Sequence, residues 1–507
     1  MFQMFKRRKT QRVPYHPVQK PRHPGALTPE AIEGLFDGCS DLEHRTVCAG
    51  GPGGVTVHVY WFDGLASSAD IAQQILRPLT EAGRFAQARS EAACRQAVLE
   101  GAVYAAPLDT CDDLDGAARA ILAGHCLMLF PRLRQAVHWD LKSSVQRSVA
   151  SPEVEKTVKG GKDAFIEILR VNTALVRRRL HDPALKSARC VVGRKSATPM
   201  TVMWLDGVAN PEIVQAVQQR LAEIDIDAVL TAGEVEQYLC ERPGLPFPQL
   251  LHTERPDRFA AGLAAGCVGL LVDGLPLGFL MPATLPQLLR VTEDRAQHFW
   301  VASALTLLRW VALVVTLLLP ATYVAVAMYH QEMIPFKLLE SVISAKQAVP
   351  FSTAAEVLGM LIAFELLQEA GLRLPNPIGE TVSIIGALIV GQSAVEARVV
   401  SPIAVIVVAL AGVCGYTQPS QDLGAAMRLG RFLLTIAAVL AGMFGVMVGT
   451  TLLVWLLCTM EFCGVAYLSP LCDADFRGWL RALLRLPRRW QKLREPALRT
   501  PDRRREK

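Results

Sequence analysis

Acidic side chains occur inside an otherwise apolar stretch between residues 352 and 370. The stretch contains Glu356, Glu365 and Glu369. At about 100° per residue of an α-helix, Glu365 and Glu369 lie about 40° apart on one face, whereas Glu356 lies nearly opposite Glu365. An ionised carboxylate that faces lipid is energetically costly. We therefore expect these groups to face a bundle interior, an aqueous cavity or the cytoplasmic interface of a membrane.

A second polar cluster follows, formed by Gln392, Glu396 and Arg398. Gln392 and Glu396 are four residues apart and share one face of a helix. Acids along such helices are compatible with a cation path. For residues 352–370 the alternative is an amphipathic helix that lies on the membrane surface. The candidate pore or ion-path residues are Glu356, Glu365, Glu369, Gln392 and Glu396.

The sequence contains no convincing motif for catalysis or for a bound group. It has no GxSxG, Walker or HExxH motif. The cysteines run from Cys39 to Cys472 without a CxxC pair or a His/Cys cluster at zinc spacing. We therefore expect neither an enzyme, nor a metal site, nor a cofactor.

The composition indicates that part of the chain lies in a membrane. Of the 507 residues, 51% are hydrophobic and 20% are charged, and the mean hydropathy is +0.27. These values argue against a fully soluble or disordered protein. The apolar segments are 299–329, 378–400, 402–416 and 431–460. The third is short enough to be a thin, broken or re-entrant span; with it, the prediction is four crossings.

Both ends of the chain are strongly basic. Residues 1–24 carry seven Lys or Arg and no acid, and residues 473–507 carry twelve basic and five acidic side chains. Because Lys and Arg next to spans resist translocation, we expect both termini in the cytoplasm. No aromatic-interleaved basic fold accompanies the tails, so a nucleic-acid partner is not expected.

The N-terminal half contains an internal repeat. Residues 59–66 (VYWFDGLA) return as 202–209 (VMWLDGVA), and the helix, Gly and strand at 117–130 return at 260–272. The simplest explanation is two copies of one strand-helix-helix-strand unit, which gives two small cytoplasmic α/β subdomains. The Asp273-Gly274 dipeptide also predicts a hairpin into residues 277–281.

The expected fold is therefore α+β followed by a polytopic helical membrane domain. The segments are a disordered basic lead-in (1–30), a first α/β subdomain (39–135), a helical connector (136–172), a second α/β subdomain (173–295), a transmembrane helical domain (296–471) and a basic cytoplasmic tail (472–507).

Several longer motifs resemble the A subunits of spore germination receptors, the GerA family. They cover residues 155–471 and include YHQEMIP (329–335), FELLQEAGLRLP (364–375), IGALIVGQSAV (385–395), TERPD (253–257) and YLSPL (467–471). Two positions depart from the family pattern: Gln368 stands where members often carry Arg, and Arg398 stands where a small residue is usual.

The resemblance implies a receptor in the inner spore membrane that responds to nutrients and triggers ion release. Its implied partners are a transporter-like B subunit, which binds the nutrient, a C subunit that is a lipoprotein, and further copies of the chain in a ring-like ion channel. Two other interpretations stay open. One is an accessory ion channel similar to stage V sporulation protein AF, and the other is a non-conducting scaffold for germination proteins.

Overall fold

The computed structural model describes residues 23–51, 53–85, 88–105, 108–143, 152, 154–373, 391–473, 476–487 and 490–504. The chain divides into two compact units. The first comprises Met1–Ser148 with Thr173–Ala188, and the second comprises Val149–Asn172 with Arg189–Lys507. Residues 1–22 of the predicted lead-in lie outside the described residues, and helix α1 (Pro29–Leu35) begins at its end.

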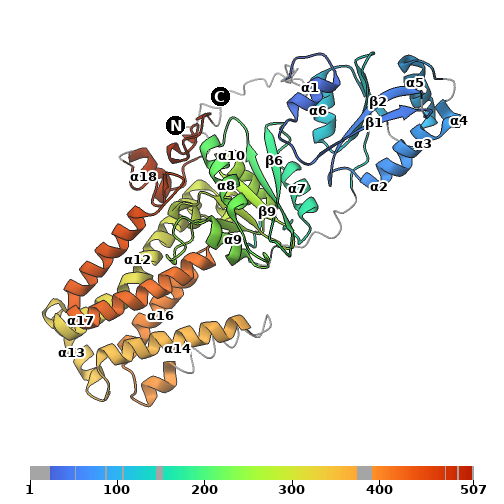
Figure 1. The fold of residues 1–507 in the computed structure, drawn as a ribbon. Coiled ribbons are helices and arrows are strands. Elements are labelled where there is room, and N and C mark those ends of the chain that lie inside the picture. Colours follow the sequence, from blue (N-terminus) through green and yellow to red (C-terminus); the bar gives the residue numbers. More distant parts are fainter. Residues whose placement is uncertain are drawn as a thin grey trace, which may run out of the picture. The chain divides into compact units, whose positions relative to one another are not determined.

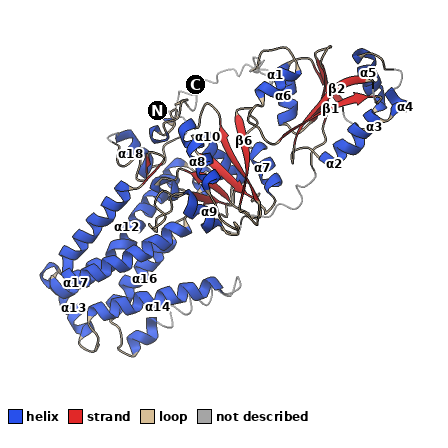
Figure 2. Cartoon of the chain, viewed as in Figure 1, coloured by secondary structure: helices blue, strands red, loops and turns tan. Residues whose placement is uncertain are grey.

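The first unit is built on a five-stranded sheet (Figure 2). Its order is β1-β2-β4-β5-β3, and neighbouring strands are antiparallel. Side chains alternate along β2: Val57 and Val59 pack on one cluster, and Tyr60 and Phe62 on the other. The strands are β1 (Leu42–Ala49), β2 (Val55–Phe62), β3 (Leu108–Cys111), β4 (Cys126–Phe130) and β5 (Gln135–Trp139); helices α2 (Ser68–Ile71), η1 (Ala72–Leu76), α3 (Arg77–Thr80), α4 (Ala82–Phe85), α5 (Glu91–Ala97) and η2 (Val98–Ala102) lie on the first face, and α1 and α6 (Leu114–Leu122) on the second.

A buried ion pair holds the end of helix α7 (Leu169–Arg177) in this unit. Arg177 is 1% exposed, and its Nη2 donates to Asp41 Oδ1 at 2.6 Å. The Ser187 hydroxyl donates to the same carboxylate oxygen at 2.6 Å, and the guanidinium lies 4.0 Å from the centroid of the Phe62 ring. These contacts satisfy the buried charge, which would otherwise be costly.

The second unit contains a second five-stranded sheet with the order β6-β7-β9-β10-β8. Helices α8 and α9 contribute to the core on one face, and Phe259 of α10 packs against Gly269 and Gly278 on the other. The elements are β6 (Leu185–Val192), β7 (Thr198–Leu205), α8 (Pro211–Glu223), α9 (Ala232–Leu239), β8 (Leu251–Thr253), α10 (Pro256–Ala265), β9 (Val268–Val272), β10 (Gly278–Met281), α11 (Leu285–Leu288) and η4 (Thr292–Arg295).

The two sheets share one topology, which confirms the predicted repeat. In each, the first and second strands pair, the fourth lies beside the second, and the third is at the far edge. The repeated glycines also match: Gly124 and Gly266 follow the equivalent helices with φ of +87° and +107°, a region that favours glycine. The hairpin at Asp273-Gly274 is confirmed by the pairing of β9 with β10.

The prediction of a helical connector over residues 136–172 is wrong for most of its described residues. Residues 135–139 form strand β5, and residues 154–167 contain no helix. This segment instead surrounds the buried Arg255 side chain, which donates to Thr157 Oγ1 at 2.9 Å and to the Gly161 carbonyl at 3.0 Å. A Cβ on Gly160 would lie 3.0 Å from Arg255 Nη2, so glycine permits this close approach.

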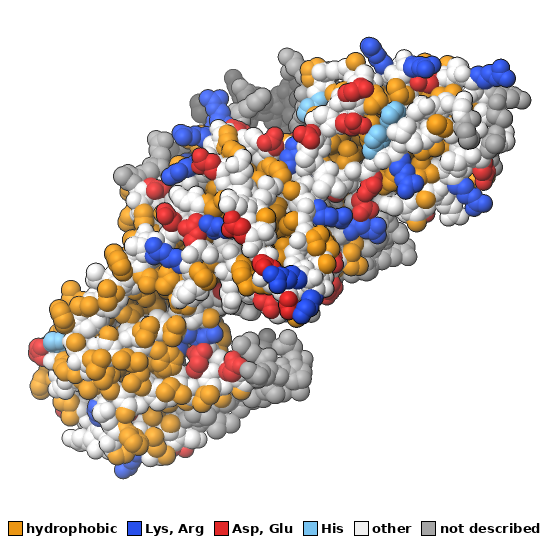
Figure 3. Space-filling view, viewed as in Figure 1, with side chains coloured by type: hydrophobic (Ala, Val, Ile, Leu, Met, Phe, Trp, Pro, Cys, Tyr) orange, Lys and Arg blue, Asp and Glu red, His pale blue; other side chains and the backbone are white. Residues whose placement is uncertain are grey.

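The rest of the second unit is helical. Helices α12 and α16 have the same bounds as the segments predicted from the sequence, whereas most of the predicted span 378–400 lies outside the described residues. Hydrophobic side chains cover much of the face of these helices in Figure 3. The elements are α12 (Phe299–Tyr329), η5 (Gln331–Met333), α13 (Phe336–Lys346), α14 (Thr353–Arg373), α16 (Pro402–Tyr416), α17 (Gln421–Thr459), β11 (Glu461–Phe462), β12 (Val465–Ala466), α18 (Phe476–Leu483) and η7 (Pro496–Leu498).

Helix α17 is a hairpin, and this corrects the predicted single span 431–460. The chain reverses at Ala441 and Gly442, where Gly442 has φ +59° and ψ −140° (Figure 1). A Cβ on Gly449 would lie 2.8 Å from Leu434, and one on Gly430 would lie 3.5 Å from Leu453, so the two halves run antiparallel. Hydropathy could not reveal the turn because both halves are apolar.

Two described helices are long and apolar enough to cross a membrane, namely α12 and α17; α16 is apolar but shorter. At 1.5 Å per residue, the two halves of α17 measure about 30 Å and about 26 Å. The length of each half is therefore close to the thickness of a bilayer core, about 30 Å.

We predict that Gly445→Ala destabilises the α17 hairpin by about 2–3 kcal/mol, because the new methyl group would overlap the Ala437 carbonyl oxygen. Gly424→Ala is the matched control on the same helix, since nothing lies within 4 Å of its added Cβ. It should be neutral or stabilising by up to about 1 kcal/mol. Thermal unfolding of the full chain in lipid nanodiscs measures both, and equal midpoints would contradict the hairpin packing.

A pair of histidines makes the first unit sensitive to acid. The Nδ1 atoms of His125 and His138 lie 3.0 Å apart in a hydrogen bond. Burial lowers the pKa of both rings, and for His138 the neighbouring His125 lowers it further. The unfolded chain therefore binds more protons, so this stability is present above pH about 6.5 and is lost as the pH falls below it.

We predict that amides of β4 and β5 lose exchange protection between pH 7 and pH 5, after correction for intrinsic exchange rates. His138→Gln should flatten this dependence because it removes one titrating ring, whereas His181→Gln, at an exposed position, should preserve it. Hydrogen exchange with mass spectrometry on the full chain provides the measurement. An unchanged pH dependence in His138→Gln would refute the assignment.

Candidate functional site

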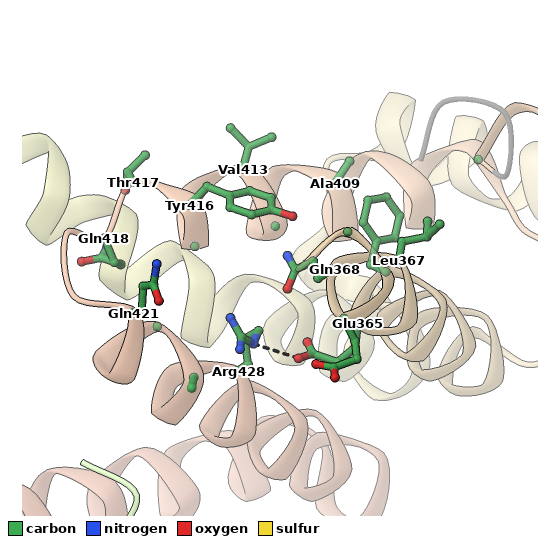
Figure 4. A pocket seen from close by; sticks show the side chains of 18 of the residues that line it. Glu365, Leu367, Gln368, Ala409, Val413, Tyr416, Thr417, Gln418, Gln421 and Arg428 are labelled. Carbon is green, nitrogen blue, oxygen red and sulfur yellow. Dashed lines mark ion pairs between the residues drawn. The ribbon is translucent and has the colours of Figure 1, made fainter. Parts of the chain in front are cut away.

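A large cavity of about 1850 Å³ lies between helices α14 and α16 and the start of α17. Four of the five predicted polar residues line it: Glu365 and Glu369 from α14, and Gln392 and Glu396 from residues 391–396. Figure 4 shows Glu365, Gln368 and Arg428 directed toward one space, with Tyr416 of α16 on its other side. The structure thus brings together side chains from segments separated by residues 374–390, which are outside the described residues.

Glu365 is paired with two arginines of α17. Its Oε1 lies 2.8 Å from Arg428 Nε, and its Oε2 lies 3.8 Å from Arg431 Nη2. Arg431 is 3% exposed, whereas Glu365 and Arg428 are about one-third exposed toward the cavity. The cavity therefore contains a positively charged side chain, Arg428, beside Glu365, which is its least exposed acid. This ion pair links α14 to α17 electrostatically.

The other acidic positions are more open. Glu369 and Glu396 are exposed, and Gln392 Nε2 donates to Glu396 Oε1 at 2.9 Å, as expected for residues one turn apart. Asp422, near the start of α17, also lines the cavity. The wall thus has four carboxylates, Glu365, Glu369, Glu396 and Asp422, and two arginines, Arg309 and Arg428.

Arg309 is not available to neutralise these acids. Its guanidinium donates to both carboxylate oxygens of Asp294, at 2.6 and 2.9 Å, and Asp294 is buried. Because this bidentate pair is self-contained, the wall has a surplus of acid. Such a wall favours a cation or a cationic group over an anion.

Glu356 lies outside this cavity. It is 3% exposed, and its Oε2 accepts a hydrogen bond from the backbone N–H of Ser401 at 2.8 Å. Ser401 is the N-cap of α16, where the positive end of the helix dipole favours a carboxylate. Glu356 therefore fastens α14 to the start of α16, which is a structural role separate from the other four positions.

The sequence interpretation missed Arg428 and Arg431. Both stand in the apolar run QDLGAAMRLGRFLL (421–434), three residues apart on one helix face. An arginine within an apolar helix is itself a signal for a partner acid. The partner could not be assigned because α14 is about 60 residues away along the chain.

Within the described ranges, no group of three or more His, Cys, Asp or Glu side chains is arranged to hold a metal ion. Two amide oxygens of the cavity residues, Gln368 Oε1 and Gln418 Oε1, are buried without a hydrogen-bond partner among the described atoms. Carbonyl oxygens of this kind suit water or a hard monovalent cation.

Comparison with known proteins connects this arrangement to one family. The family model described as Bacillus/Clostridium GerA spore germination protein matches residues 30–497. The membrane protein YfkQ of Bacillus subtilis, described as uncharacterized, is 37% identical over 86% of this chain and 83% of its own length. Spore germination protein KA of the same species is 32% identical over 88% of this chain and 82% of its own.

Spore germination protein GerLA of Bacillus cereus is 31% identical over 88% of this chain and 89% of its own length. Among solved structures, the N-terminal domain of the A subunit of the Bacillus megaterium spore germinant receptor GerK3 is 25% identical and has a TM-score of 0.42, covering 53% of this chain and 99% of that domain. On the strength of the family model and these full-length relatives, the chain belongs to the GerA family of spore germination proteins.

Proposed function

We propose that this chain is the A subunit of a nutrient-responsive germination receptor in the inner spore membrane, and that its acid-lined cavity is part of a gated cation path. The role is that of a receptor and conducting subunit and not of an enzyme. Its proposed partners are a B subunit that binds the nutrient, a C subunit that is a lipoprotein, membrane lipid and further copies of the chain.

The directions of the helices support a polytopic membrane domain. Gln418 after α16 donates to the Arg309 carbonyl at 3.3 Å, and Thr316 donates to the Ala411 carbonyl at 3.3 Å, so α16 runs antiparallel to α12. A Cβ on Gly430 would lie 3.2 Å from Leu317, and the Tyr329 hydroxyl at the end of α12 donates to the Val439 carbonyl at 2.6 Å, so the first half of α17 runs parallel to α12. The second half of α17 returns, which places its end on the side where α12 begins.

The outward surface of these helices supports contact with lipid. Large apolar side chains on α17 are more than 60% exposed, among them Leu440, Phe444, Met447 and Trp455. A patch of this extent is unusual on a soluble monomer and is typical of a membrane or protein interface. The second half of α17 ends on the side where α12 begins, and the basic ends of the sequence favour the cytoplasm for that side.

The proposal of a cation path rests on one observation. A single cavity among apolar helices is lined by Glu365, Glu369, Gln392 and Glu396. Ionised carboxylates among apolar helices cost folding free energy, and a conducting role explains why the chain has several of them here. The described crossings of one chain are too few to enclose an obvious pore, so we propose that several copies assemble around a symmetry axis.

Neutralising the open acids should reduce conduction. We predict that Glu369→Gln with Glu396→Gln lowers potassium flux through full-length protein in liposomes about tenfold, the equivalent of about 1.4 kcal/mol in cation affinity or barrier height. Glu340→Gln, on exposed α13 and outside the cavity lining, is the control and should conduct like the parent. If the double variant assembles normally and conducts potassium like the parent, the proposal of a cation path through this cavity is wrong.

Removing the positive charge of Arg428 should have the opposite effect on potassium flux. Arg428→Gln leaves Glu365 without its nearest partner, so the cavity becomes more negative and potassium flux should rise several-fold. Glu365→Gln should lower it, because Arg428 is then a net positive charge in the path. Flux assays of both variants in the same liposomes test the sign, and changes in the same direction would contradict an electrostatic role.

A further inference from the structure

The His252 side chain lies between two carboxylates at the junction of the second α/β subdomain with helix α17. Its Nδ1 is 3.1 Å from Asp422 Oδ2, and its Nε2 is 3.5 Å from Glu236 Oε2. The ring is 20% exposed and meets the edge of Phe279 at 5.1 Å between centroids. The acids come from α17 and α9, and Phe279 comes from β10, so three elements enclose the imidazole.

The two ends of the α17 hairpin both contact the same subdomain. At the other end of the hairpin, Arg242 Nη1 donates to Thr459 Oγ1 at 3.0 Å, and the Cys463 N–H donates to Glu241 Oε1 at 2.8 Å. The second attachment uses an arginine and a backbone N–H, whose charge does not change near neutral pH. The first depends on an imidazole, which does titrate there.

Only a doubly protonated ring presents an N–H to each of the two acids, and the 3.5 Å contact of Nε2 with Glu236 is an electrostatic contact and not a hydrogen bond. A neutral imidazole has one N–H and one lone pair, so it can donate to only one of the two acids and presents a lone pair to the other. Without the imidazolium, the carboxylates of Glu236 and Asp422 would face each other across the ring with no cation between them. Protonation therefore decides whether this contact attracts or repels.

We propose that His252 is a proton-operated latch: its imidazolium holds the first turns of α17 against the α/β subdomain, and loss of the proton releases them. Burial lowers the pKa of His252, but the hydrogen bond to Asp422 and the charges of Glu236 and Asp422 outweigh burial and raise it overall. Burial is the main reason that the pKa of Glu236 is also raised.

The sign of the pH dependence follows from the raised pKa of His252. The folded chain binds this proton more tightly than the unfolded chain, so the stabilisation is complete below pH about 6.5 and is lost as the pH rises through the raised value. The latch is thus closed at acidic pH and opens toward alkaline pH, opposite to the dependence of the His125–His138 pair.

Helix α17 connects the latch at His252 to the cavity. Asp422 and Arg428 are six residues apart on α17, about 9 Å along its axis, and Arg428 carries the ion pair to Glu365. Release of the first turns therefore weakens the Arg428–Glu365 contact. The step from the latch to conduction rests on the proposed function, whereas the latch itself does not.

Hydrogen exchange of the full chain in lipid nanodiscs tests the latch directly. For amides of residues 424–431, we expect protection about tenfold higher at pH 6 than at pH 9 after correction for intrinsic exchange. In His252→Gln the protection should be low and independent of pH, while protection of β8 and β9 shows that the subdomain is folded. His298→Gln, an exposed histidine at the start of α12, should behave as the parent.

A second variant covers the case in which His252→Gln does not fold. Asp422→Asn keeps the side-chain shape and removes one of the two acids, so the pH at which protection is lost should move to a lower value. Protection that is equal at pH 6 and pH 9 in the parent, or an unchanged transition in Asp422→Asn, would overturn the latch.

Potassium flux measured in liposomes at the same pH values separates the two proposals. Flux that rises from pH 6 to pH 9 in the parent and is independent of pH in His252→Gln supports coupling of the latch to the cavity. A pH-dependent exchange transition with no flux at any pH contradicts the cation path while supporting the latch. A pH-dependent flux that persists in His252→Gln overturns the coupling.

Discussion

The requirement that an acid among apolar helices has a positively charged partner governs how the helices around the cavity meet, and the ion pair between Glu365 and Arg428 meets this requirement. A carboxylate among apolar helices is tolerated only where a cation or several donors lie beside it. The 2.8 Å contact therefore joins α14 to α17 at the wall of the cavity. Once Arg428 and Arg431 face α14, Leu429, Leu433 and Leu440 are directed outward, where they form part of the apolar surface.

Much of the architecture could be predicted from the sequence because it is local or repeated. The VYWFDGLA and VMWLDGVA phrases each contain a buried strand and a glycine turn, and the structure places them at equivalent positions of two sheets of one topology. The bounds of α12 and α16 follow from apolar runs with polar ends, in which Arg309 of α12 is the one charged residue. The helical periodicity also separated Glu356 from Glu365 and Glu369, and the structure puts the first on the start of α16 and the others on the cavity.

Two kinds of feature could not be predicted from the sequence. They are the points where the chain reverses its direction and the side-chain contacts between residues far apart in the sequence. The α17 hairpin turns at Gly442 within a run that is apolar on both sides, so hydropathy gives one long helix where the packing of Gly449 on Leu434 gives two. The sequence predicts a helix over residues 154–167, but Gly160 permits the close approach of the Arg255 guanidinium, which donates to Thr157 and to the Gly161 carbonyl. The pairing of His252 with Asp422 joins positions 170 residues apart, beyond the reach of any local pattern.

A helical hairpin attached at both ends to one α/β subdomain transmits motion differently from a single helix. Because His252 and Arg242 belong to the same subdomain, its displacement carries the two halves of α17 together and preserves the glycine contacts between them. Helix α14 is instead fastened to α16 through Glu356. In the described part of the chain, the ion pairs that join α14 to α17 are those of Glu365. The charged junction between these two groups of helices therefore coincides with the acid-lined cavity.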